Sequence, residues 1–223
     1  NRHILDIIEK LIGSEINSNP VQNSRIKQPE KFLKKKTLYN GLSGRTPWHQ
    51  DAGVLSVKGQ KQTDLITCWV PFTKTTKKNG CMITVPGLQK KGLFNHDADS
   101  TGQAYIRKSE LLNKFKIVTL EANLGDIVLL SKHTVHCSLP NISNNFRISM
   151  DLRYHKSGQP SGRDLLPNFC VRSKNKNQIK INNFKQWLAV WEKAKQKCIP
   201  KKYTFKYQTP TFKGNKRDLS NLI

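Results

Sequence analysis

Two short stretches of the sequence place polar side chains at spacings that suit metal chemistry. His49 and Asp51 stand two residues apart in TPWHQDAG (46–53), and His136 stands in TVHCSL (134–139). Two imidazoles and one carboxylate form the facial ligand set of non-heme Fe(II) oxygenases, which leaves other coordination positions open. The same residues are compatible with a surface His–Asp pair and a structural histidine, so both interpretations stay open on spacing alone.

A third stretch, FRISMDLRY (146–154), alternates between apolar and polar side chains. In an extended strand, one face carries Phe146, Ile148, Met150, Leu152 and Tyr154, and the other carries Arg147, Ser149, Asp151 and Arg153. The guanidinium of Arg147 could bind a carboxylate through two parallel hydrogen bonds. A strand whose charged face points to solvent is the alternative.

Several β-like runs separated by turn signals surround these residues. We expect strands at 65–72, 81–86, 115–121, 126–130, 134–139 and 146–154. Short strands at this spacing predict a sandwich or a barrel.

Helices are predicted on both sides of these strands. Apolar residues at helical spacing over 4–12 indicate a first helix that ends at Gly13. A second helix is expected at 183–197, and a short one in SELLNKF (109–115). The apolar face of the 183–197 helix, which we expect to pack against the sheet, consists of Phe184, Trp187, Leu188 and Trp191.

We expect one domain over residues 1–223, because a chain of this length can bury a core. The stretches 14–48 and 87–114 show no regular strand pattern and contain turn-forming residues, and they predict loops over the site. Residues 198–223 form a basic tail that contains proline.

Composition excludes one class of protein and favours a compartment. No apolar run approaches the roughly 20 residues that a spanning helix needs, so we expect no membrane span. The first residues lack the pattern of a signal peptide, and the five cysteines form no CxxC pair. Reduced thiols and a cytoplasmic location are the expectation.

The balance of charge favours anionic partners. The chain has 39 Lys and Arg against 15 Asp and Glu, a net charge of +24. The lysines are scattered and do not alternate with aromatic residues, as they do in proteins that bind single-stranded nucleic acid. A lysine-rich surface is therefore expected more than nucleic-acid binding, which is kept as an alternative.

The order of several motifs resembles a known family. WHQDAG, TCWVPF, NGCMITVPG, GDIVLL, HCSLPN and the arginine of NNFRISMDLRY occur here in the order typical of the phytanoyl-CoA dioxygenase family of Fe(II)/2-oxoglutarate oxygenases. The resemblance implies a mainly β protein with flanking α-helices, in which a double-stranded β-helix (a cupin-like jelly roll) is buttressed by helices.

The resemblance also implies the metal ligands. His49, Asp51 and His136 match the family's three iron ligands. His136 is preferred to His133, because the family places its distal histidine two residues before a serine and eleven before an arginine. Ser138 and Arg147 satisfy this spacing.

Residues of a 2-oxoglutarate site follow from the same resemblance. Arg147 is expected to pair with the distal carboxylate of 2-oxoglutarate, Ser138 to assist it by hydrogen bonding, and Trp69 to form a wall of the pocket. Arg25 and Lys27 could contact an anionic substrate or cosubstrate. We interpret His96 and Asp97, in FNHDAD, as ordinary loop residues.

The implied reaction uses Fe(II), 2-oxoglutarate and O2 to hydroxylate a C–H bond of a small, acyl or anionic substrate, with release of succinate and CO2. Asp51 fills the position that halogenating relatives leave to a small residue, which favours hydroxylation over halogenation. Desaturation and ring formation stay open, as do the substrate and the oligomeric state. Two alternatives from other classes are a non-catalytic cupin-like metal-binding protein and a basic nucleic-acid-binding module.

Overall fold

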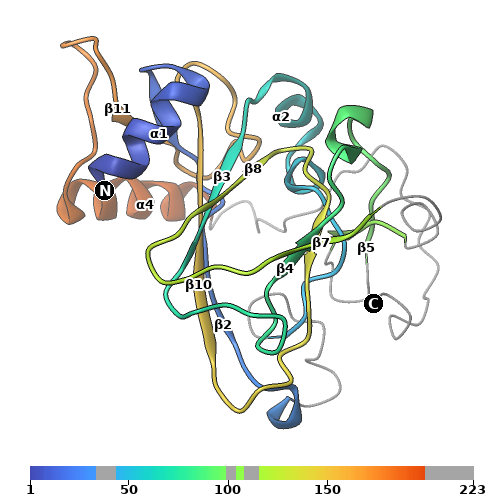
Figure 1. Cartoon of the computed structure of the whole chain (residues 1–223). Coiled ribbons are helices and arrows are strands. Elements are labelled where there is room, and N and C mark those ends of the chain that lie inside the picture. Colours follow the sequence, from blue (N-terminus) through green and yellow to red (C-terminus); the bar gives the residue numbers. More distant parts are fainter. Residues whose placement is uncertain (34–43, 99–103, 108–115, 199–223) are drawn as a thin grey trace.

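Two antiparallel sheets form the centre of the protein (Figure 1). The computed structural model describes residues 1–33, 44–98, 104–107 and 116–198. The larger sheet has the order β11 (Phe169–Arg172), β1 (Ile16–Ser18), β10 (Arg147–Lys156), β3 (Ile66–Pro71) and β8 (Val128–Ser131), and β2 (Asn23–Lys27) also pairs with β10. The smaller sheet contains β7 (Val118–Leu120), β4 (Met82–Thr84) and β9 (His136–Ser138). This architecture confirms the predicted class, a mainly β jelly roll with flanking helices.

The long strand β10 organises the larger sheet. Its residues 147–151 pair with β2, and its residues 154–156 pair with β1, while β3 pairs along the other side. The prediction that 14–48 is irregular is therefore wrong for β1 and β2. These strands are only three and five residues long, and β2 has the polar sequence NSRIK, so neither carries the apolar alternation by which strands are predicted.

The charged face of β10 points into the protein. Arg147, Ser149, Asp151 and Arg153 are each at most 4% exposed, whereas Ile148 on the opposite face is 38% exposed. A solvent-facing charged side, the alternative kept above, is thus wrong. The polar side chains face the interior between the sheets, and this arrangement builds a polar site inside a β-rich fold.

The outer side of the larger sheet is covered by helix α1 (Arg2–Ile12). The helix begins where Asn1 accepts a hydrogen bond from the Ile4 N–H, and Gly13 donates back to the Glu9 carbonyl at 2.9 Å. Its buried residues Ile8 and Ile12 join Ile16 and Cys68 in one apolar cluster. A second cluster, around Trp48, Ile83, Val85, Leu88, Ile106, Val135 and Cys137, supports the smaller sheet.

The remaining elements include further helices and short strands. They are α2 (Val57–Gln62), α4 (Phe184–Cys198), the short strands β5 (Asp97–Ala98) and β6 (Ala104–Tyr105), and the 3-10 helices η1 (Glu30–Phe32), η3 (Asp51–Val54) and η4 (Leu88–Lys91). The helix predicted at 109–115 and the tail from 199 lie outside the described residues. None of the described helices is long and apolar enough to cross a membrane.

Helix α4 lies where the sequence predicts a helix, but its apolar face does not pack as expected. Phe184 is 68% exposed, Trp187 is 40% exposed and Leu188 is 38% exposed, so the predicted burial of this face against the sheet is wrong for these three residues. The helix instead buries Ala194, and Trp191 is half-buried.

Candidate active site

A pair of backbone hydrogen bonds brings the two predicted histidine ligands together. The N–H of His49 donates to the His136 carbonyl at 2.9 Å, and the N–H of His136 donates to the His49 carbonyl at 3.0 Å. The segment before η3 thereby pairs with β9, and both side chains point to the same side. Their ring centroids are 4.2 Å apart.

Asp51 completes the cluster from the first position of η3. Its Oδ1 lies 3.9 Å from Nε2 of His49, and ligand atoms of His49, Asp51 and His136 all lie within 4.8 Å of one another. All three residues are buried. His133, the alternative that the sequence analysis set aside, does not belong to this group; its carbonyl accepts a hydrogen bond from Gln50.

Both imidazoles are oriented by a carbonyl two residues earlier in the chain. Nδ1 of His49 lies 2.8 Å from the Pro47 carbonyl, and Nδ1 of His136 lies 2.9 Å from the Thr134 carbonyl. A carbonyl only accepts, so each Nδ1 carries the proton and each Nε2 keeps its lone pair. This is the arrangement in which metal-binding histidines are held.

The protonation states of the cluster fit a divalent metal. Burial and the neighbouring His136 lower the pKa of His49 to about 3, so its imidazole is neutral. Burial alone would raise the pKa of Asp51, but the Arg153 guanidinium and the two imidazoles hold it below its usual value. A neutral nitrogen donor and an ionised carboxylate are the forms that bind a metal.

The carboxylate of Asp51 is fixed by two further buried side chains. Oδ1 accepts from Arg153 at 2.9 Å, and Oδ2 accepts from the Thr67 hydroxyl. Arg153 lies 3.5 Å from Asp151, which is 2.7 Å from Arg25. Acidic and basic side chains thus alternate from the His–Asp–His cluster to the wall of the pocket. The sequence analysis missed this arrangement, because strand alternation alone does not show which side chains face each other.

Arg147 is a buried cation beside the histidines. It is 1% exposed, its guanidinium lies 5.6 Å from the Trp69 ring centroid, and its NH1 donates to Ser149 at 2.6 Å. Its Nε has no hydrogen-bond partner, and no acidic group within the described ranges forms an ion pair with it. Burial, followed by the repulsion of Arg25, lowers the pKa of Arg147 to about 10.

A second buried cation, Lys27, stands directly opposite Arg147 in the pairing of β2 with β10. Its Nζ donates to Ser138 Oγ and to the Leu139 carbonyl, each at 2.6 Å. Burial and the charge of Arg147 lower its pKa well below the usual value. Like charges in register destabilise a sheet, and an anion placed between them would remove that cost.

The hydroxyl of Ser138 is left with its proton to donate. Oγ accepts from Lys27 at 2.6 Å and from the Thr46 N–H at 3.0 Å. A hydroxyl has two acceptor sites and one donor, so the O–H can turn to an acceptor in the pocket. Ser138 is therefore suited to hydrogen-bond a carboxylate.

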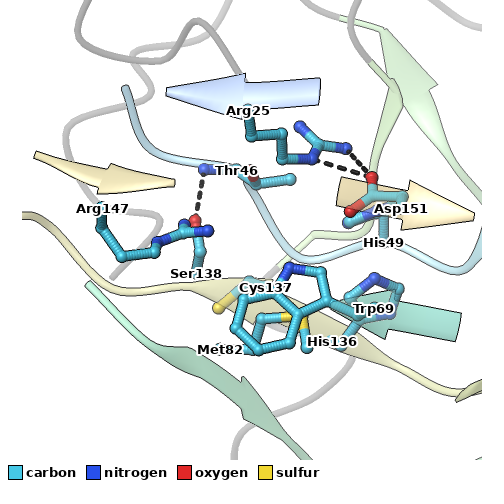
Figure 2. Close-up of a pocket in the computed structure, with 10 residues that line it drawn as sticks. All are labelled: Arg25, Thr46, His49, Trp69, Met82, His136, Cys137, Ser138, Arg147 and Asp151. Atoms are coloured by element: carbon cyan, nitrogen blue, oxygen red, sulfur yellow. Dashed lines mark hydrogen bonds and ion pairs between the residues drawn. The ribbon is translucent and has the colours of Figure 1, made fainter. Parts of the chain in front are cut away.

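These groups surround one cavity, shown in Figure 2. Arg147 and Ser138 lie at one end, the two histidines lie at the other, and the indole of Trp69 lies between them. The lining residues are Arg25, Thr46, His49, Trp69, Met82, His136, Cys137, Ser138, Arg147 and Asp151. Five of the six predicted site residues line the cavity, and Asp51 adjoins it through His49.

His96 lies in a loop, as predicted, but it is not an exposed loop residue. It is fully buried, and its Nε2 accepts a hydrogen bond from the Gln50 N–H at 3.0 Å. Gln50 stands between His49 and Asp51, and its side-chain amide donates to the carbonyls of Gly92 and His133. The prediction of a loop is wrong for Asp97, which belongs to β5, pairs with Tyr105 of β6 and forms an ion pair with Arg107. The residue between the two motif ligands is thus anchored on both sides, which its place in the HxD motif does not predict.

The chain is similar to proteins of a known family. The sequence model of the phytanoyl-CoA dioxygenase (PhyH) family matches residues 3–149. The chain is 35% identical over 121 residues to a phytanoyl-CoA dioxygenase domain-containing protein 1 homolog of Dictyostelium discoideum, which covers 51% of this chain and 41% of that protein. The chain spans less than half the length of the curated relatives it matches.

Solved structures share the fold. The apo form of the non-heme monooxygenase ThoJ superposes with a TM-score of 0.61 and 19% identity, covering 89% of this chain and 74% of that chain. EvdO2 from Micromonospora carbonacea var. aurantiaca, complexed with 2-oxoglutarate, superposes with a TM-score of 0.52 and 17% identity, covering 70% and 58% of the two chains. At these identities the likeness concerns the fold.

Proposed function

Because the chain belongs to the phytanoyl-CoA dioxygenase family, we propose that it is an Fe(II)- and 2-oxoglutarate-dependent oxygenase. The proposed reaction hydroxylates an unactivated C–H bond of a small, acyl or anionic substrate and releases succinate and CO2. The observation that carries the proposal is the neighbourhood of two features: a His–Asp–His cluster, and a buried arginine that lacks an ion-pair partner in the described part of the chain.

His49, Asp51 and His136 would hold the iron. Two imidazoles and one carboxylate are the donors of the facial triad, and all three come from buried, hydrogen-bonded positions. Fe(II), bound there with 2-oxoglutarate and O2, supplies the redox chemistry that couples decarboxylation of the cosubstrate to oxidation of a C–H bond.

Arg147, Lys27 and Ser138 would hold the distal carboxylate of 2-oxoglutarate. The carboxylate would receive charge-assisted hydrogen bonds from the guanidinium and a further bond from the Ser138 hydroxyl. Its negative charge would lie near the two cations that are paired in register on β2 and β10. The complex of EvdO2 with 2-oxoglutarate, a protein of the same fold, supports this cosubstrate.

The surrounding side chains orient the reacting groups and exclude water. Trp69 covers the guanidinium of Arg147, and Met82 adds an apolar side chain to the same cavity. Arg153 favours the ionised form of Asp51, and this carboxylate would fill the coordination position that a halide would need. For this reason the proposal favours hydroxylation over halogenation.

The test is succinate formation from 2-oxoglutarate, measured in the presence of Fe(II), ascorbate and air. CoA thioesters, free carboxylic acids and phosphorylated small molecules would be added separately as candidate substrates. We expect one class to stimulate succinate formation and to be recovered in hydroxylated form, and we expect Asp51→Ala to abolish both. Metal binding by the parent without succinate above the Asp51→Ala level would contradict the proposal and favour a metal-binding protein without turnover.

A further inference from the structure

Helix α4 presents large apolar side chains to solvent. Phe184 is 68% exposed, Trp187 is 40% exposed and Leu188 is 38% exposed. Their spacing of three and four residues places them on one side of the helix. Ile179, which precedes the helix, is 77% exposed. We call Ile179, Phe184, Trp187 and Leu188 the tryptophan ridge, and large exposed apolar side chains gathered in one segment are typical of a contact site.

The rings of the ridge form a continuous aromatic strip. Phe184 and Trp187 stack with centroids 5.7 Å apart and an interplanar angle of 25°, and Trp187 lies 6.0 Å from Trp191. An indole combines an apolar body with one polar N–H group. It therefore suits a boundary between water and an apolar phase.

Basic side chains surround the ridge. Between residues 173 and 198 the chain has seven lysines and one acidic residue, Glu192. All seven are exposed: Lys174, Lys176, Lys180, Lys185, Lys193, Lys195 and Lys197. A helix with aromatic and aliphatic residues on one side and lysines around them has the composition of helices that lie in the interface of anionic membranes.

The ridge is separate from the candidate active site. Figure 1 shows α4 on the opposite side of β10 from β4 and β7, and none of its residues lines the cavity. The apolar ridge and its lysines are therefore not explained by the proposed oxygenase chemistry.

We propose that the tryptophan ridge and its lysines dock on the surface of an anionic lipid bilayer. The lysines would face the lipid headgroups, while the ring and aliphatic side chains would enter the boundary with the acyl chains. The net charge of +24 attracts such a surface and opposes contact with a second copy of the chain.

The ridge fits a bilayer better than a nucleic acid. Bases stack on open aromatic faces, but Phe184 and Trp187 are already stacked on each other. Leu188 and Ile179 are aliphatic and offer bases neither a π-face nor a hydrogen bond. They would gain from entering an apolar phase.

The first test is cosedimentation of the full chain with vesicles of phosphatidylcholine alone or mixed with phosphatidylserine. Binding is expected only to the phosphatidylserine vesicles. Phe184→Ser/Leu188→Ser should weaken it by roughly tenfold or more, because two large apolar side chains no longer enter the bilayer. The matched control Phe72→Ser/Leu124→Ser, which changes side chains that are 52% and 69% exposed elsewhere, should bind like the parent.

Tryptophan fluorescence gives a second readout that does not depend on affinity. Trp48 and Trp69 are 2% exposed, so a blue shift on adding vesicles would come from Trp187 and Trp191. Trp187→Phe should keep vesicle binding and lose most of the shift.

Four results would overturn the proposal. The first is no binding to either kind of vesicle, and the second is equal vesicle binding by Phe184→Ser/Leu188→Ser and its control. The third is self-association of the chain through the ridge. The fourth is that the parent binds a single-stranded oligonucleotide and no vesicle, and that Phe184→Ser/Leu188→Ser no longer binds the oligonucleotide.

Discussion

Arg153 is the buried cation that orients and ionises Asp51. Its side chain is 3% exposed, and it donates to Asp51 at 2.9 Å and to Thr67 at 3.2 Å. The change Arg153→Met keeps much of the side-chain volume and removes every donor. Asp151 would keep its ion pair with Arg25, whereas Asp51 would be left with the hydroxyl of Thr67.

The expected magnitudes follow from this burial. Removal of one partner from a buried ion pair costs about 3–5 kcal/mol of folding free energy, which for a chain of this size lowers Tm by roughly 6–20 °C. Loss of a group that orients a metal ligand weakens metal binding about 10- to 100-fold. The pKa of Asp51 would rise, because burial raises it and the guanidinium no longer opposes that effect. Protons would then displace the metal at a higher pH than in the parent.

The assay is calorimetric titration of the metal-free protein with Co(II) from pH 6 to pH 8, together with thermal unfolding. Ile8→Ala is the control, because Ile8 is fully buried under α1 and its truncation costs about 2–5 kcal/mol without touching the site. Both variants should have a lower Tm, but only Arg153→Met should lose Co(II) affinity, and increasingly so toward pH 6. Arg153→Lys should recover part of the loss. A folded Arg153→Met protein that binds Co(II) as tightly as Ile8→Ala at every pH would refute the reasoning.

Three further predictions use simpler readouts. Arg147→Gln should weaken 2-oxoglutarate binding, measured by calorimetry on the Co(II) protein, by roughly 10- to 150-fold, while Co(II) affinity is unchanged; equal 2-oxoglutarate affinity would contradict the role of this cation. Burial lowers the pKa of both His96 and His155 to about 4. The metal-free protein should therefore lose about 1.4 kcal/mol of unfolding free energy per histidine and pH unit as pH falls from 6.5 toward 4. Urea unfolding at pH 7 and pH 5 tests this, and His155→Gln should reduce the difference in unfolding free energy between the two pH values. Gly53→Ala should destabilise the protein by about 1–3 kcal/mol, because the added Cβ would lie 2.6 Å from the ring of His96. Urea unfolding should show that His96→Ala partly relieves this cost in the double variant. If the losses of unfolding free energy of the two single variants simply add in the double variant, the contact is not the cause.

Much of the fold follows from local patterns. The strands β3, β4, β7, β8, β9 and β10 overlap the predicted runs, because each alternates or is apolar over several residues. β1 and β2 could not be found in this way, since their pairing partner is the distant strand β10. Non-local hydrogen bonds make these short polar segments into strands.

The candidate site shows a similar division. The motif spacing indicated His49, Asp51 and His136 as ligands, and the structure brings their donor atoms together. The alternation of β10 predicted a charged face but not its direction, because charged residues usually face solvent. Arg153 gave no separate signal, since its importance depends on Asp51, which is 102 residues away in the sequence.

The exposed face of α4 has the same explanation. Helical spacing predicts that Phe184 and Trp187 share a face, and they do. Spacing does not show which residues of the helix are buried, and here Ala194 is buried while Phe184 and Trp187 stay exposed. The position of an amphipathic helix is set by the shape of its neighbour as well as by its own pattern.

The central claim is that the His–Asp–His cluster binds Fe(II) with 2-oxoglutarate beside Arg147. The direct measurement adds Fe(II) and 2-oxoglutarate to the metal-free protein without oxygen and records the visible spectrum. We predict a weak charge-transfer band of the metal–2-oxoglutarate chelate in the parent and its absence in His136→Ala. If the parent binds Fe(II) and develops no band when 2-oxoglutarate is added, the assignment of this cavity as an oxygenase site is wrong.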